Sequence, residues 1–124
     1  MVSVIYHTDG AVTEAVDGLI DTGIDVLLVL PCGGQALQFS AKGMDPRVLK
    51  ERFGERLCFE GEVSVQTTLP FGTVEDVREE VEELVRVLSA GGGYILGPSH
   101  AIQAGTPPEN IVAMFDTALG SYSF

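Results

Sequence analysis

Four apolar segments alternate along the chain with four segments of helical spacing, and this alternation limits the fold more than any other feature. The apolar segments span residues 2–7, 24–30, about 57–63 and 94–97. The second of them, IDVLLVL, is an almost unbroken apolar run, which is typical of strands covered on both faces. Strands that alternate with helices form parallel sheets with right-handed crossovers. We therefore predict an α/β fold in which a single domain spans residues 1–124.

Helix signals follow the first two strands. Gly23 ends the first helix, and the second begins after Asp45 with Pro46 and runs to about Phe53, before Gly54. The predicted apolar face of the first helix comprises Val12, Ala15, Val16, Leu19 and Ile20.

The two later helices carry capping signals at their first residues. Thr73, with Asp76 three residues on, opens the longest helix, and Thr106 and Glu109 have the same spacing before the last helix. The apolar stripe of the longest helix comprises Val74, Val77, Val81, Leu84, Val85 and Leu88. Its acidic residues form a solvated face to which we assign no function. The buried face predicted for the last helix comprises Ile111, Met114, Phe115, Ala118 and Leu119.

Two architectures fit four strand–helix pairs. One is a small open sheet with helices on both faces, and the other is half of an eightfold barrel. A complete barrel of this kind has roughly 250 residues, which is close to twice the length of this chain. A lone half barrel exposes two strand edges and an apolar inner face, so we expect it to associate with itself or with another chain.

The charge balance excludes several classes of partner. Seven Lys and Arg against eighteen Asp and Glu give a net charge of −11 at pH 7, which disfavours binding to nucleic acid or to an anionic membrane surface. No apolar run approaches the roughly 18 residues of a membrane span, and we see no secretory signal at the N-terminus. Cys32 and Cys58 cannot form a disulfide framework, so we expect reduced cysteines in a cytoplasmic protein.

The carboxyl ends of parallel strands are where ligands gather in both architectures. Both histidines of the chain, His7 and His100, are predicted at this edge. The other polar residues predicted there are Thr8, Asp9, Cys32, Glu60, Glu62, Ser64 and Ser99.

Each of these residues also has a purely structural interpretation. Asp9 can cap the first helix, His7 can be a hydrogen-bonded core residue, and Cys32 can be a small buried residue beside a turn. Glu60 and Glu62 can face solvent at the strand end. A Glu60 that points inward needs a partner, because an isolated buried carboxylate is costly.

Two imidazoles and a carboxylate can support two kinds of chemistry. His7, Asp9 and His100 supply the three protein ligands that a catalytic zinc ion requires beside its open position. The same groups can act without a metal, because a carboxylate stabilises a developing cation and a histidine donates a proton near neutral pH. The His-x-Asp motif does not decide between these alternatives.

Five segments of the chain together resemble the uroporphyrinogen decarboxylase family. They are HTDG at residues 7–10, SAKGMDP at 40–46, TLPFGT at 68–73, GGGYIL at 91–96 and TPPENI at 106–111. Their order and spacing agree over nearly the whole chain, but only with the C-terminal half of the family's single (β/α)8 TIM barrel. The resemblance therefore implies a half barrel, completed by self-association or by a separate N-terminal half-barrel chain.

The resemblance implies two chemistries. Uroporphyrinogen decarboxylases are lyases of porphyrin biosynthesis that remove carboxyl groups from a tetrapyrrole without cofactor or metal. The related corrinoid-dependent methyltransferases carry a methyl group from methylcobalamin to a thiol such as coenzyme M and use zinc to activate the thiol. The GGGYILGPSHAI segment is more similar to the second branch.

At the positions that match the motifs of the family, some residues are those of the methyltransferases and others are those of the decarboxylases. His7 matches the first residue of the His-x-Cys motif of the methyltransferases, but Asp9 and His100 stand where that branch has cysteines. Asp9-Gly10 and His100 match the decarboxylases, whereas Ser64 stands where the decarboxylases have an aspartate. Zinc remains chemically possible with these ligands, although the softer thiolates are lost.

From these matches we expect His7, Asp9 and His100 to be catalytic, and to be the metal ligands if zinc is used. We expect Lys42, Glu60, Glu62 and Ser64 to contact a tetrapyrrole or corrinoid-linked substrate. A polycarboxylate substrate needs cations, and Lys42 is the best placed of them. The arginines that hold the substrate in decarboxylases belong to the missing half.

The predicted function is a decarboxylase-like module of tetrapyrrole metabolism that needs a second half barrel. The alternatives are a zinc-dependent corrinoid methyltransferase module and a non-catalytic half barrel that binds a partner.

Overall fold

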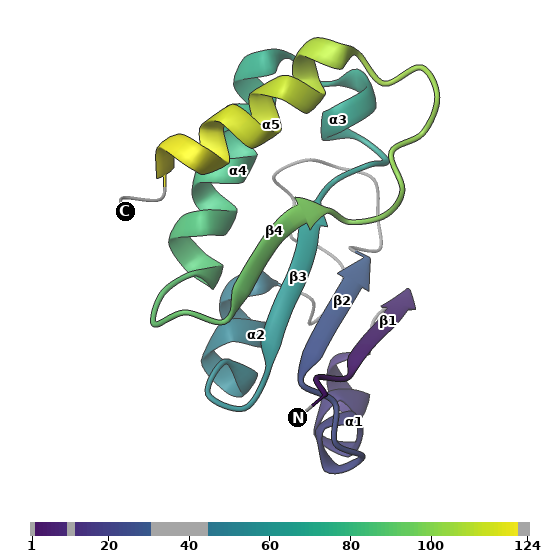
Figure 1. Ribbon diagram of the computed structural model, residues 1–124, viewed down its shortest axis with the longest axis vertical. Coiled ribbons are helices and arrows are strands. Elements are labelled where there is room, and N and C mark those ends of the chain that lie inside the picture. The colour runs from purple at the N-terminus through teal and green to yellow at the C-terminus, as the bar shows by residue number, and fades with distance from the viewer. Residues whose placement is uncertain (1, 10–11, 31–44, 122–124) are drawn as a thin grey trace.

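The computed structural model describes residues 2–9, 12–30 and 45–121 and contains the predicted alternation of strands and helices (Figure 1). The elements are β1 (Ile5–Asp9), a 3-10 turn (Thr13–Ala15), α1 (Val16–Asp21), β2 (Val26–Leu30), α2 (Pro46–Phe53), β3 (Cys58–Val63), α3 (Thr68–Phe71), α4 (Val74–Leu88), β4 (Tyr94–Pro98) and α5 (Pro108–Ser121). The four strands, the long helix and the last helix are where the sequence predicts them. The short helix α3 was not predicted.

All four strands are parallel and pair in chain order, β1-β2-β3-β4. Tyr6, Leu27, Phe59 and Tyr94 stand in register across the sheet. Consecutive neighbours with helical crossovers are the arrangement of a (β/α)8 barrel, and four such units are half of one. The prediction of an α/β half barrel is therefore confirmed.

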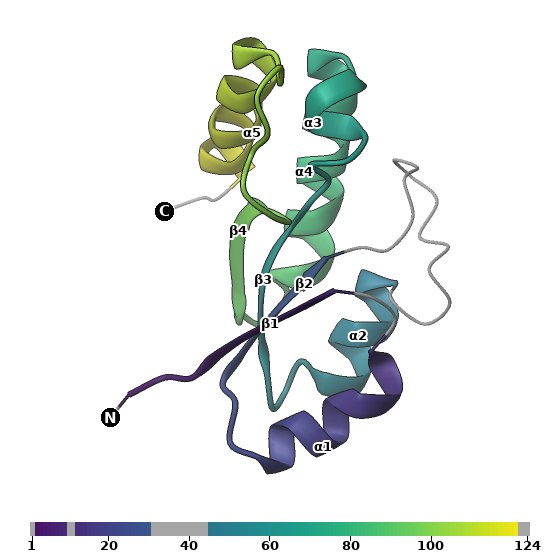
Figure 2. The same cartoon turned by 90° about the vertical axis from the view of Figure 1, so that its right-hand side faces the viewer.

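One face of the sheet carries the hydrophobic core. Leu27, Phe59 and Val63 are completely buried there, and α4 packs against β3, α2 and α5. Figure 2 shows α1 and α2 along one side of the sheet. The predicted stripe of α4 is confirmed, because Val77, Val81, Leu84, Val85 and Leu88 are all buried. Each buried side chain of this size stabilises the fold by about 1.5–3 kcal/mol.

The alternate positions of the strands face away from this core. His7, Leu28, Glu60 and Ile95 stand in register in the next row of the sheet. His7 is exposed, Leu28 and Glu60 are half-buried, and Ile95 is 50% exposed. We call this row the inner face, because it corresponds to the interior of a closed barrel.

The last helix differs from its predicted orientation. Met114 and Ala118 are buried as expected, but Phe115 and Leu119 are 50% and 65% exposed, so their assignment to the buried face is wrong. The buried side of α5 carries Ala113, Met114 and Ala118, and α5 packs against α4. Val112, Phe115 and Leu119 form an exposed apolar row, which we call the outer stripe of α5.

Within the described ranges, no helix has both the length and the apolar composition needed to cross a bilayer.

Candidate functional site

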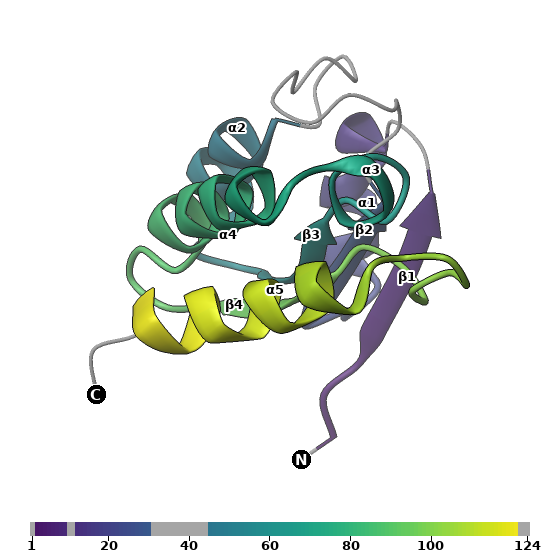
Figure 3. The same cartoon turned by 90° about the horizontal axis from the view of Figure 1, so that it is seen from above.

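The two histidines of the chain meet at the carboxyl edge of the sheet. His7 lies in β1, and His100 follows β4 by two residues. Their ring centroids are 5.8 Å apart and the ring planes are tilted by 58°. Both residues are exposed. Figure 3 shows the loop between β4 and α5 beside the end of β1, so the outermost strands of the half barrel are bridged at this edge.

Ser99 fixes the backbone next to His100. Its amide donates a hydrogen bond of 2.8 Å to the carbonyl of Val63, and its hydroxyl accepts one of 3.3 Å from the amide of Val65. Ser99 is almost fully buried. The segment after β4 is thereby attached to the segment after β3, and this attachment brings His100 to its position above the sheet.

Glu60 lies on the inner face in the same row as His7, with one strand between them. It is half-buried, so its carboxylate is neither fully solvated nor fully enclosed. A contact between Glu60 and a substrate stays a prediction.

Glu62 does not face solvent as its structural interpretation supposed, because only 6% of it is exposed. Gly61 and Glu62 both adopt left-handed backbone, with φ of 92° and 80°, and this interrupts the alternation of β3. Burial, reinforced by the nearby charge of Glu80, raises the pKa of Glu62 to about 8. Sequence patterns gave no signal of this pairing, because Glu80 belongs to an acidic run on α4 that otherwise faces solvent.

Glu80 is half-buried, although the sequence pattern places it on the solvated face of α4. Its Oε1 accepts a hydrogen bond of 3.0 Å from the amide of Ser64, whereas its Oε2 is buried without a hydrogen bond. Burial raises the pKa of Glu80, and the nearby Thr68 hydroxyl and the Ser64 amide oppose that rise. The Ser64 hydroxyl contacts the Thr67 hydroxyl at 2.8 Å and the amides of Gln66 and Thr67, so in this structure it stabilises a turn.

Three of the predicted site residues fall partly or wholly outside the described part of the structure. The backbone of Asp9 pairs with Leu30 at the end of β1, but its side chain is not among those described. Cys32 and Lys42 lie outside the described residues altogether.

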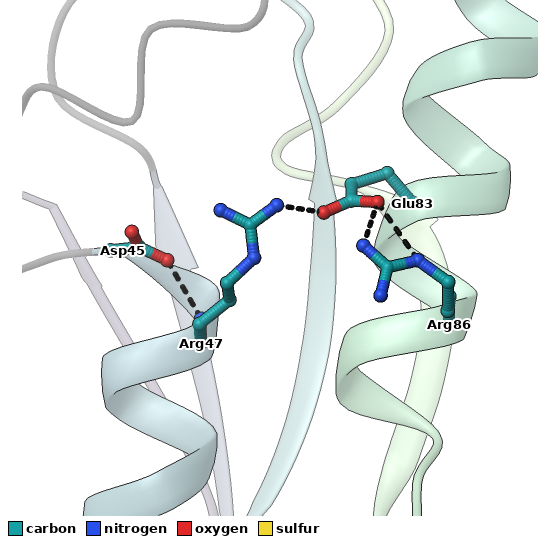
Figure 4. A network of polar contacts seen from close by, with 4 residues as sticks. All are labelled: Asp45, Arg47, Glu83 and Arg86. Atoms are coloured by element: carbon teal, nitrogen blue, oxygen red, sulfur yellow. Dashed lines mark hydrogen bonds and ion pairs between the residues drawn. The ribbon is translucent and has the colours of Figure 1, made fainter.

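The described cations lie on the helices, away from the histidine pair. Arg47, Lys50 and Arg52 belong to α2, Arg56 follows it, and Arg78 and Arg86 belong to α4. Arg47 and Arg86 both contact Glu83, and the amide of Arg47 donates to Asp45 at 2.8 Å (Figure 4). Arg86, followed by Arg47, lowers the pKa of Glu83.

Other helix cations also have local partners. Arg56 contacts Asp17 at 2.6 Å, and Lys50 donates to the carbonyl of Gly92 at 2.6 Å. Along the described strand ends and the loop between β4 and α5, there is no Lys or Arg to hold an anion.

The spacing of the two imidazoles suits a shared metal ion. Two imidazoles on one tetrahedral zinc, with Zn–N bonds of about 2.0–2.1 Å, place their ring centroids roughly 5 Å apart. The observed 5.8 Å is close to that spacing. The described side chains of residues 2–8, 12–28 and 45–120 include no group of three potential metal ligands, and the third ligand predicted from the sequence, Asp9, is not among them.

Comparison with known proteins gives a match to a sequence family and matches to solved structures. A sequence model described as Uroporphyrinogen decarboxylase (URO-D) matches residues 1–120. A solved structure, a methyltransferase from Methanosarcina mazei, superposes with a TM-score of 0.74 at 25% sequence identity. The match covers 98% of this chain and 32% of the methyltransferase, so the chain spans about one third of that protein's length. No curated protein sequence matches the chain. Because the family model covers nearly all of its residues, the chain belongs to the uroporphyrinogen decarboxylase family.

Proposed function

We propose that this chain carries half of the active site of a zinc-dependent methyltransferase, which transfers a methyl group from a corrinoid to a thiol. The observation that carries the proposal is the meeting of His7 and His100, with ring centroids 5.8 Å apart at the carboxyl edge. The similarity to a methyltransferase over 98% of the chain supports it. The acidic balance of the chain also favours a cation at this edge over an anion.

In this proposal, His7 and His100 would hold the zinc ion, and Asp9 would supply a third ligand. When bound, zinc lowers the pKa of a substrate thiol so that the thiolate is present at neutral pH. The thiol would release its proton to solvent, and its sulfur would then form a bond to the methyl carbon. The bond from that carbon to the corrinoid breaks, and its electron pair stays with the corrinoid. Ser99 holds the backbone of His100, and Glu60 adds negative charge to the same face.

Decarboxylation of a porphyrinogen is the second candidate, and the family match over residues 1–120 favours it. In that reaction a carbon–carbon bond breaks to release CO2, and His100 or His7 donates the proton that replaces the carboxyl group. A substrate with many carboxylates needs several cations. The described part of this chain has none at the edge, so Lys42 and a second half barrel would have to provide them.

We further propose that a second copy of the chain completes the site. The strand β1 lies at one edge of the sheet and β4 at the other, and both have the same direction. The β4 strand of one copy can therefore pair with the β1 strand of another. Two such pairings, related by a twofold axis, would close a barrel of eight parallel strands. Apolar residues are exposed along this seam: Val4, Tyr6 and Ile95 on the strands, and the outer stripe of α5.

One pair of assays on the same purified protein distinguishes between the two reactions. With zinc, methylcobalamin and a small thiol, we expect formation of the methylated thiol, and we expect His7→Gln to lose at least 100-fold of that rate. Release of CO2 from a porphyrinogen without added zinc would instead establish the second candidate. Absence of both reactions, together with partner binding that survives replacement of both histidines by alanine, would establish a non-catalytic half barrel.

A further inference from the structure

Glu60 is a carboxylate on the inner face of the sheet that has no partner in the described part of the chain. Its neighbour Phe59 is completely buried in the core, and successive side chains of a strand alternate, so Glu60 lies on the opposite face. It is half-buried and forms no hydrogen bond or ion pair with a described residue. A carboxylate that is partly removed from water is costly until a donor or a cation replaces the lost hydration.

The neighbours of Glu60 on this face are apolar. Leu28 on β2 and Ile95 on β4 stand in register on its two sides, and His7 lies beyond Leu28. Leu28 is half-buried and Ile95 is 50% exposed. Apolar neighbours lower the local polarity, which strengthens the attraction between a carboxylate and a cation. Two interstrand spacings of about 4.8 Å place the Cα atom of Glu60 roughly 10 Å from that of His7.

The described cations of the chain all have other local partners. Arg47 and Arg86 contact Glu83, Arg56 contacts Asp17, Arg78 contacts Glu75, Lys50 donates to the carbonyl of Gly92, and Arg52 lies over the ring of Phe53. A second copy of the chain would bring a second Glu60 into the completed barrel, together with the same set of occupied cations. A ligand is therefore the source of positive charge that fits Glu60.

We propose that Glu60 binds the cationic group of the methyl acceptor, and hence that the acceptor is a small aminothiol. This inference rests on the proposed function, in which the reacting sulfur lies at His7 and His100. A protonated amine a few carbon atoms from that sulfur would reach Glu60 along the same row, with its carbon chain on Leu28. Glu60 is then a specificity-determining residue, because a thiol with a carboxylate at the same place would meet its negative charge.

The first test measures binding without a metal and without a free thiol. The probes are methylthioethylamine, methylthioethanol and methylthiopropionate, which are similar in size and are cationic, neutral and anionic at neutral pH. Their binding would be followed by NMR on the methyl signals of Leu28 and Ile95, assigned with Leu28→Val and Ile95→Val. We expect saturable shifts of both signals with methylthioethylamine, and a Kd at least tenfold higher for methylthiopropionate.

Variants in the same titration assign the binding to Glu60. Glu60→Gln should weaken binding of methylthioethylamine at least fivefold, whereas Glu51→Gln, which alters an exposed glutamate on α2, should not change it. In the wild type, added salt should weaken binding of the cationic probe more than that of the neutral probe. The inference would be overturned by equal binding of the cationic and anionic probes, by cation binding that persists in Glu60→Gln, or by the absence of saturable binding.

Lys42 lies outside the described residues, so Lys42→Gln belongs in the same series. We expect this variant to bind methylthioethylamine as the wild type does. Binding that appears only in Lys42→Gln would assign Glu60 to an ion pair within the chain and would overturn the inference.

Methyl-transfer assays distinguish this inference from the proposed function. With zinc and methylcobalamin, Glu60→Gln should raise the ratio of the KM for aminoethanethiol to that for mercaptoethanol at least fivefold, and Glu51→Gln should not change this ratio. Equal kcat/KM for aminoethanethiol and mercaptopropionate would overturn the inference and leave the proposed function standing. Binding of methylthioethylamine through Glu60 without methyl transfer to any thiol would overturn the proposed function and support the cation site.

Discussion

The ring centroids of His7 and His100 lie 5.8 Å apart, although one residue belongs to the first strand and the other follows the last strand of the sheet. In an open sheet, four parallel strands would separate two such residues by three interstrand spacings of about 4.8 Å. Here the loop between β4 and α5 returns toward β1 (Figure 3), and the two rings lie close together. The loop after β4 therefore connects the two outermost strands at this edge within a single chain.

The buried Glu62 should make the protein less stable at alkaline pH. Its pKa rises from 4.5 in the unfolded chain to about 8 in the folded protein, so the folded state binds the proton more tightly. The stability from this proton is complete below about pH 4.5 and is lost as the pH rises through 8. Glu62→Gln should remove this loss, so that its free energy of unfolding in urea changes little between pH 6 and 9. The control variant Glu79→Gln should lose stability over this range as the wild type does. If Glu62→Gln loses as much stability as the wild type, Glu62 is not the group responsible.

Asn110 should be important for stability because its side chain forms hydrogen bonds that connect α5 to α3. It is 2% exposed, and its amide nitrogen donates to the carbonyls of Leu69 and Gly72 at 2.9 Å and 2.8 Å. Asn110→Ala leaves these carbonyls without their donor, and we expect a loss of about 2–3 kcal/mol in the free energy of unfolding. Gln66→Ala, which alters an exposed side chain, is the matched control and should lie within about 0.5 kcal/mol of the wild type. Equal stability of the two variants would contradict this role of Asn110.

Substitutions in the outer stripe of α5 should weaken the association of two chains without affecting the folding of each chain. Phe115 and Leu119 are exposed in the single chain, so Phe115→Ser with Leu119→Ser should leave its unfolding transition nearly unchanged. The same double variant should weaken a dimer at least tenfold in sedimentation equilibrium. Met114→Ala, on the buried side of the same helix, should instead cost about 2–5 kcal/mol of stability. A wild-type protein that stays monomeric at tens of micromolar would show that the other half barrel is not a second copy.

The alternation of strands and helices was predictable because each element has its own local pattern. The stripe from Val77 to Leu88 has helical spacing, and residues 24–30 form a continuous apolar run. The orientation of α5 was not predictable in this way. Phe115 and Met114 are both large and apolar and adjacent in the sequence, and only the packing of α5 against α4 decides which of the two is buried.

Only part of the candidate site was predictable from the sequence. The strand ends marked His7 and His100, since parallel strands bring their carboxyl ends together. The Glu62–Glu80 pair could not be anticipated, because it depends on the left-handed turn at Gly61 and Glu62. That conformation is uncommon for glutamate, and no local sequence signal indicates it.

Zinc binding tests the central claim most directly. Purified protein would be treated with a chelator, reloaded with zinc and dialysed, and its metal content then measured beside His7→Gln, His100→Gln and the exposed control Gln103→Ala. We predict one zinc per chain in the wild type and the control, and less than one fifth of that in either histidine variant. Wild-type protein that retains no zinc, or histidine variants that retain it fully, would contradict the assignment of His7 and His100 to a metal-binding active site.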